Sequence, residues 1–96
     1  ENQEALVDII MSDSDLQYDF EKVIQLDKNY KEAYRGKGVC YSRLGDNDLA
    51  IKNYEKALQI DPNYEESYFN RSVAYLKQDD LRKAIKDLDK VIGLVT

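Results

Sequence analysis

Residues 31–64 and residues 65–96 of this chain repeat each other at a fixed offset of 34 residues. At this offset the large apolar side chains come into register. The matching pairs are Tyr34 and Tyr68, Tyr41 and Tyr75, Ala50 and Ala84, and Ile51 and Ile85. A repeat of this length predicts a helical solenoid, in which each unit buries its apolar face only against its neighbours.

Helical periodicity fills the second unit between its few helix-breaking residues. Spacings of four and three place Tyr34, Gly38 and Tyr41 on one helix face. A second helix carries the same kind of stripe, formed by Ala50, Ile51, Tyr54, Ala57 and Leu58. Between the two helices, Gly45 is suited to end a helix and Asp46 to cap the next one. Pro62 stops the second helix, because the residue before a proline avoids helical geometry.

The other two units follow the same plan. In the third unit, Asp79 or Asp80 is expected to cap a helix from about residue 81 to residue 92. In the first unit, residues 1–11 supply one helix, and residues 12–15 supply the turn and cap. The next helix has an apolar face of Leu16, Phe20, Val23, Ile24 and Leu26. We therefore predict a single domain over residues 1–96, made of units at 1–30, 31–64 and 65–96 with about six helices.

The charge distribution argues against nucleic acid and membrane as partners. The net charge is −5, and residues 1–30 alone hold eight acids and two bases. Nucleic-acid affinity comes mainly from clustered Lys and Arg, which this balance lacks. No apolar run approaches the ~20 residues that span a bilayer, so membrane insertion is not expected. The sequence leaves the compartment open and slightly favours the cytoplasm.

Groups that would indicate catalysis, a metal or a cofactor are missing from the sequence. Histidine, the commonest general base and metal ligand, does not occur. The lone Cys40 fills a small apolar position of the repeat, so we interpret it as a packing residue. Acidic pairs recur in every turn without the glycine and closing glutamate of a calcium loop, which favours helix capping. We expect no enzyme activity, no cofactor and no metal site.

In the order and spacing of its apolar, small and turn residues, the chain resembles the tetratricopeptide repeat family. The second unit follows the family pattern at Tyr34, Gly38, Tyr41, Ala50, Tyr54, Ala57 and Pro62, with Lys37 in place of the usual leucine. The third unit follows it at Tyr68, Ser72, Tyr75, Ala84, Leu88 and Val91, with Arg71 in place of the leucine and Thr96 in place of the proline. The partial first unit aligns Val7, Leu16, Phe20, Val23 and Lys28, with Leu16 in place of the small alanine and Lys28 in place of the proline. The resemblance implies an all-α fold, an α-solenoid of three stacked helix-turn-helix units in a right-handed superhelix.

The resemblance also implies a non-catalytic scaffold for protein–protein interaction, which binds a peptide or helix of a partner protein on its concave side. We call the candidate positions on that side the inner face: Glu32, Arg35, Val39, Arg43, Glu66, Phe69, Asn70, Val73 and Lys77. Phe69, Val73 and Leu76 form an apolar strip outside the core pattern. Two interpretations stay open: a modest patch covered by neighbouring side chains, or a shallow groove for a peptide with apolar anchors and an acidic group.

One specialisation of the family does not fit this sequence. Some members hold the carboxylate end of chaperones with Lys, Asn, Asn, Lys and Arg spread over three units. The matching positions here hold Glu1, Ala5, Gly36, Glu66 and Asn70. We do not expect such a clamp in these residues.

The C-terminal end offers a second candidate surface. The last unit is followed by Val91, Ile92, Leu94 and Val95, which leave an apolar side of the final helix without an obvious cover. Repeat arrays normally end in a helix with a polar outer face. Two covers stay open: further chain of the parent protein, or a second molecule. The alternative function is therefore structural, with homo-oligomers formed by stacking through the uncapped ends, and Val91, Leu94 and Val95 are its candidate residues.

Overall fold

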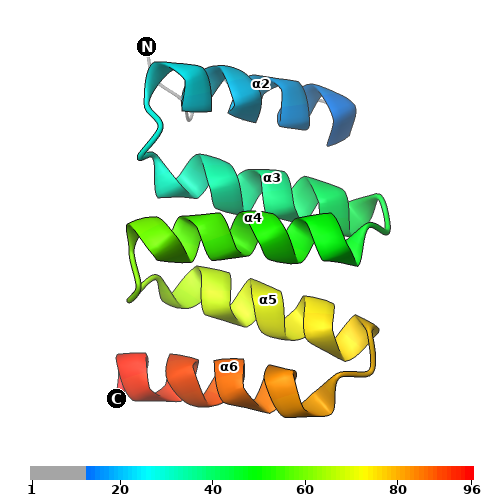
Figure 1. Ribbon diagram of the computed structural model, residues 1–96, viewed down its shortest axis with the longest axis vertical. Helices are drawn as coiled ribbons and strands as arrows, with labels where there is room; N and C mark the ends of the chain where they lie inside the picture. The colour runs from blue at the N-terminus through cyan, green and yellow to red at the C-terminus, as the bar shows by residue number, and fades with distance from the viewer. Residues whose placement is uncertain (1–12) are drawn as a thin grey trace.

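A computed structural model describes the backbone of residues 13–96 and the side chains of residues 19–96. That part of the chain folds into helices without a strand: α2 (Asp13–Leu26), α3 (Lys31–Arg43), α4 (Asn47–Ile60), α5 (Glu65–Lys77) and α6 (Leu81–Val95). The helices stack one upon the next, and consecutive helices run antiparallel (Figure 1). This arrangement is the predicted all-α solenoid of helix-turn-helix units. The helix predicted over residues 1–11 lies outside the described residues.

The turns between helices confirm the expected capping chemistry. Asp46 accepts a hydrogen bond at Oδ1 from the Leu49 backbone N–H, at 3.1 Å, and so caps α4. Asp80 does the same for α6, accepting from the Lys83 N–H at 3.2 Å. Gly45 has φ +88°, the left-handed conformation that ends a helix at little cost. The third unit has Asp79 at the matching place with φ 60°.

Two expectations about the first unit were wrong. Residues 13–15 belong to helix α2 and not to the preceding turn. This follows the repeat, since Asn47 opens α4 one repeat length later. Leu26 is not part of the apolar face, because its side chain is 86% exposed. At 3.6 residues per turn it lies about 90° around the helix from the centre of the stripe formed by Phe20 and Val23.

The core lies between α3, α4 and α5, and α4 supplies most of it. One cluster joins Ala50, Ile51 and Tyr54 of α4 to Ala74 of α5. A second cluster joins Ala57 and Leu58 of α4 to Tyr64, the residue just before α5. All the α4 positions named from the sequence stripe are buried. The small residues of the pattern therefore allow close helix packing.

Gly38 shows how close this packing is. A Cβ atom placed on Gly38 would lie 2.4 Å from the ring of Tyr54 and 3.0 Å from the Ala50 carbonyl oxygen. No real Cβ tolerates the first distance, so the approach of α3 to α4 requires a residue without a side chain here. Burial raises the pKa of the Tyr54 hydroxyl to about 12, opposed by the positive charge of Arg35.

None of the helices in the described part of the chain is long and apolar enough to cross a membrane.

Candidate functional site

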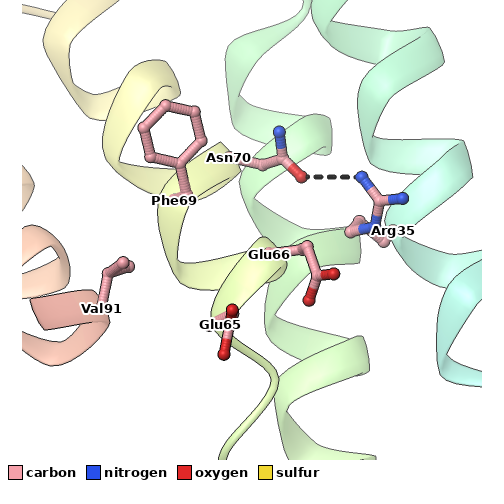
Figure 2. A pocket seen from close by; sticks show the side chains of 6 residues that line it. All are labelled: Arg35, Glu65, Glu66, Phe69, Asn70 and Val91. Atoms are coloured by element: carbon pink, nitrogen blue, oxygen red, sulfur yellow. Dashed lines mark hydrogen bonds between the residues drawn. The ribbon is translucent and has the colours of Figure 1, made fainter. Parts of the chain in front are cut away.

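Helices α3 and α5 are the first helices of the second and third units, and side chains join them across the inner face. Arg35 donates from Nε to the Tyr64 hydroxyl at 2.9 Å. It also donates from a terminal nitrogen to Asn70 Oδ1 at 3.1 Å (Figure 2). Lys77 donates from Nζ to Ser42 Oγ at 3.2 Å. The structure therefore brings the predicted residues Arg35 and Asn70 into direct contact.

A hollow of about 330 Å³ opens beside this contact. Phe69 and Val91 border it on one side, and the acidic pair Glu65 and Glu66 lies near Arg35 (Figure 2). Phe69 is a large aromatic residue, yet its side chain is 51% exposed. An accessible aromatic ring next to charged groups can contact an apolar side chain of a ligand.

The other predicted residues of the inner face differ in accessibility. Val39 and Val73 are half-buried, and Val39 packs against the core cluster around Tyr54. Leu76 is exposed, as are Glu32 and Arg43. The apolar strip named from the sequence is thus accessible mainly at its two ends, Phe69 and Leu76.

Several charged groups interact with Tyr64 at the end of the inner face where Arg35 lies. Burial raises the pKa of the Tyr64 hydroxyl, while the hydrogen bond from Arg35 lowers it. Lys31 lies over the Tyr64 ring at 4.6 Å from its centroid, and its ammonium forms an ion pair with Asp61. This ion pair raises the pKa of Lys31 and lowers that of Asp61. Arg35 is therefore held in place before any ligand arrives.

Two residues of this site were missed from the sequence. Neither Tyr64 nor Glu65 is among the residues predicted for the inner face. The signal for Tyr64 was its position just before a predicted helix, where its hydroxyl can reach the following unit's inner face. Nothing in the repeat pattern marks Glu65, because the first turn of a helix favours acids wherever it lies.

The C-terminal residues do not all lie where the sequence placed them. Val95 is exposed and Leu94 is half-buried. Val91, assigned to the C-terminal end, lines the hollow with Phe69. Leu81, Ile85 and Ile92 of α6 are each more than half exposed, as Val95 is.

Among the residues whose side chains are described, no group of His, Cys, Asp and Glu is placed to hold a metal ion.

A family model described as TPR repeat matches residues 40–79, and one described as tetratricopeptide repeat matches residues 65–94. No curated protein matches the chain by sequence.

Solved structures share the fold. A crystal structure of MamA is 27% identical over 85% of this chain, with a TM-score of 0.81. The translocator chaperone SycD of Yersinia enterocolitica is 24% identical over 88% of the chain, with a TM-score of 0.82. The first TPR of Spaghetti (RPAP3), bound to an HSP90 peptide, is 21% identical over 85% of the chain, with a TM-score of 0.82.

The chain is shorter than these proteins. It spans 48% of the MamA chain, 58% of the SycD chain and 65% of the Spaghetti chain. The two family models together cover residues 40–94, more than half of the sequence. The chain belongs to the tetratricopeptide repeat family.

Proposed function

We propose that this domain is a non-catalytic interaction module, which binds a peptide or helical segment of a partner protein on its inner face. The observation that carries the proposal is the hollow lined by Phe69 and Arg35, which combines an exposed aromatic ring with an ordered guanidinium. Tetratricopeptide repeats with bound peptide, such as the Spaghetti domain with its HSP90 peptide, support this class of function. Their likeness to this chain concerns the fold, so the partner is not carried over.

The inner face offers two kinds of contact. Phe69 and Leu76 provide accessible apolar surface for the side chains of a ligand. A guanidinium has five N–H donors, and Arg35 uses two of them on Tyr64 and Asn70. The remaining donors suit a carboxylate of the ligand, because Arg pairs with carboxylates in a planar, two-pronged geometry. The expected ligand therefore combines an apolar anchor with an acidic group.

A selection from a random peptide library, displayed on phage and panned against the whole chain, tests this function. The enriched peptides should carry an apolar residue near an acidic one. Phe69→Ala should weaken their binding at least tenfold, and Arg35→Glu should abolish it by reversing the charge.

The matched control is Ile85→Asp, a substitution at an exposed site on α6 away from the hollow. It should leave the affinity of the selected peptides unchanged. Peptides that bind Phe69→Ala and Arg35→Glu as tightly as the original chain would overturn the inner face as the binding site.

A second candidate is assembly through the C-terminal end. One observation favours it: Ile92 and Val95 of α6 are each 58% exposed, at the end of the stack (Figure 1). Exposed apolar surface of this kind is typical of association sites. A concentration series in analytical ultracentrifugation should show an increase in mass, which Leu94→Asp with Val95→Asp removes. A mass that stays monomeric up to high concentration would exclude assembly between copies.

A further inference from the structure

A second hollow, of about 240 Å³, lies where the turn after α2, the first turn of α3 and the last turns of α4 meet at one edge of the stack (Figure 1). Its lining residues are Lys28, Tyr34, Lys56, Gln59 and Ile60. It shares no lining residue with the hollow of the inner face. We call it the lysine hollow and treat it as a separate candidate site.

The polar side chains that line the lysine hollow supply hydrogen-bond donors and no carboxylate. Lys28 and Lys56 each carry an ammonium group with three N–H donors, Tyr34 carries a hydroxyl, and Gln59 carries a side-chain amide. Among residues 19–96, no carboxylate forms an ion pair with either lysine. Two positive charges therefore line one hollow without a counter-charge from the described chain.

The turn after α2 does not need a lysine. In this turn and in the turn after α4, an asparagine N–H donates to the side chain of the aspartate two residues before it, at 3.0 Å in both. The next tyrosine N–H donates to the carbonyl oxygen of the same aspartate, at 3.2 Å and 3.1 Å. The two turns differ in sequence at one position, where Lys28 stands in the first and Pro62 in the second. The Lys28 side chain is thus available for another role.

Tyr34 and Tyr68, one repeat length apart, show the consequence of this difference. The Tyr68 hydroxyl donates to the Pro62 carbonyl oxygen at 2.8 Å. Among residues 19–96, the Tyr34 hydroxyl has no such acceptor. Its ring is held in place, because it packs against the core cluster of Ala57, Leu58 and Tyr64. An ordered ring therefore presents a hydroxyl that a ligand can engage.

The third unit has a poorer version of the same place. Lys90 lies 5.8 Å from the centroid of the Tyr68 ring, as Lys56 does from the Tyr34 ring. This contact of lysine with tyrosine belongs to the repeat. The second ammonium and the amide do not, because Pro62 and Gly93 occupy the positions that match Lys28 and Gln59.

The dipole of α4 does not account for Lys56. Cations are favoured in the last turn of a helix, beside the free carbonyl groups, and the effect falls off beyond that turn. The last turn of α4 contains no basic residue, and Lys56 lies four residues before its final residue, Ile60. Pairing with an external anion is the remaining electrostatic role for this lysine.

Two ammonium groups suit an anion with two charges. A phosphate monoester carries about −1.5 to −2 charges at pH 7 and has three strong acceptor oxygens. A carboxylate has one charge and would leave one lysine without a counter-charge. The lysine hollow has the volume of about eight water molecules at ~30 Å³ each, so a phosphate group fits together with the carbon atoms next to it.

We propose that the lysine hollow binds a phosphate monoester group. Lys28 and Lys56 pair with its charge, and the Tyr34 hydroxyl donates to one of its oxygens. The phosphate belongs either to a phosphorylated side chain of a protein or to a small phosphate ester, and a titration separates these two sources. The site does not rest on the function proposed for the inner face.

NMR titration of the whole ¹⁵N-labelled chain, in a buffer without phosphate, tests the site. The probes are glycerol 3-phosphate and a blocked tripeptide with phosphoserine between two alanines. With either probe, the amide signals of residues 28–34 and 56–60 should shift in a saturable manner. A peptide that binds at least threefold more tightly than glycerol 3-phosphate identifies a phosphorylated protein segment as the source. Equal or weaker binding of the peptide identifies a small phosphate ester.

Substitutions at the lining residues should weaken the binding of both probes. Lys28→Pro, which restores the residue found in the turn after α4, and Lys56→Gln should each weaken it about fivefold, the upper range of an exposed ion pair. Together they should weaken it about twentyfold if their effects add. Tyr34→Phe keeps the ring and should weaken it about threefold through the lost hydrogen bond.

Two controls separate this site from other positive charges. Lys90→Gln removes the matching lysine of the third unit and should leave the binding of both probes unchanged. Phe69→Ala, in the hollow of the inner face, should leave it unchanged as well. Lys28 and Lys56 are exposed, so the melting temperatures of their variants should stay close to that of the original chain. Lys28→Gln removes the charge without changing the backbone and should weaken binding as Lys28→Pro does.

Three outcomes would overturn the proposal. The first is the absence of saturable shifts at residues 28–34 and 56–60 with both phosphate probes. The second is equal binding by the original chain and by the double variant Lys28→Pro with Lys56→Gln. The third is a blocked tripeptide with aspartate in place of phosphoserine that binds as tightly as the phosphopeptide, which would make a carboxylate the ligand.

Discussion

Arg71 of α5 donates two hydrogen bonds to the carboxylate of Asp87 of α6, one from Nε at 2.8 Å and one from a terminal nitrogen at 2.7 Å. The carboxylate is buried, with its side chain 6% exposed, and the Arg71 side chain is 19% exposed. The hydrogen bond and charge of Asp87 raise the pKa of Arg71 further above its ordinary value. This pair joins the two helices of the third unit at a position where the family pattern has a leucine.

Arg71→Met should lower the free energy of unfolding by about 3 kcal/mol, because it leaves the Asp87 carboxylate buried without its partner. Urea denaturation followed by circular dichroism measures the change. The matched control is Lys37→Met, one repeat length earlier, whose partner Glu21 has a side chain 47% exposed, against 6% for Asp87. That control should cost about 0.5 kcal/mol. If the two substitutions lower the free energy of unfolding equally, the buried Arg71–Asp87 pair contributes no more to stability than the Lys37–Glu21 pair.

Ser67→Ala should raise the free energy of unfolding by about 1 kcal/mol. The Ser67 hydroxyl is completely buried and finds no hydrogen-bond partner among residues 19–96, so its desolvation is uncompensated. Ala33 holds the same place one repeat length earlier and is equally buried.

Ser72→Ala should change the free energy of unfolding in the opposite direction, measured by the same urea denaturation. The Ser72 hydroxyl is also buried but donates to the Phe69 carbonyl oxygen at 2.6 Å. Its removal should lower stability by about 1 kcal/mol. If Ser67→Ala destabilises the chain as much as Ser72→Ala does, the Ser67 hydroxyl has a partner in solution.

Replacing glycine with alanine should change the stability in opposite directions in α3 and α6. Gly38→Ala forces a Cβ into the Tyr54 ring and should cost about 2 kcal/mol, in spite of the better helix propensity of alanine. Gly93→Ala meets open space and should stabilise α6 by about 1 kcal/mol. Thermal melts of the two variants would contradict the packing argument if Gly38→Ala melted higher than the original chain.

The repeat itself offers a compensated form of the Gly38 change. One repeat length later, Ser72 and Leu88 replace the pair Gly38 and Tyr54. A smaller partner makes room for a Cβ atom. In the double variant Gly38→Ser with Tyr54→Leu, the loss of stability should therefore be smaller than the sum of the two single losses.

Stability should fall as the pH rises from about 10 to about 12, because of Tyr54. Its folded pKa is raised to about 12 by burial, whereas an unfolded tyrosine titrates near pH 10. In this window the unfolded chain loses a proton that the folded chain keeps, so deprotonation favours unfolding. Below pH 10 the contribution is fully present.

Tyr54→Phe removes this titration and should flatten the fall in stability over that pH window. Part of the slope should remain, because burial also raises the pKa of Tyr64 and of Tyr75. Denaturant midpoints measured across the window test this. An unchanged slope in Tyr54→Phe would mean that Tyr54 is ionised normally in the folded chain.

Much of the architecture could be predicted from the sequence because the responsible forces are local or repeated. Asp46 and Asp80 cap helices whose first residues follow them directly, and Gly45 ends a helix by its own backbone freedom. The buried stripe of α4 was predicted because an offset of 34 residues shows each apolar position twice. Leu26 was placed wrongly because it is apolar but lies to the side of the buried stripe.

Only the tertiary structure decided which groups meet across helices. Arg71 and Asp87 are 16 residues apart, and Arg35 and Asn70 are 35 apart. No local spacing specifies either contact, because each depends on how two helices pack. The same holds for Ile51 and Ile85: the sequence makes them equivalent, whereas burial depends on whether another helix covers them. Periodicity thus determined the faces of the helices, and packing determined which faces are filled and which remain open to a partner.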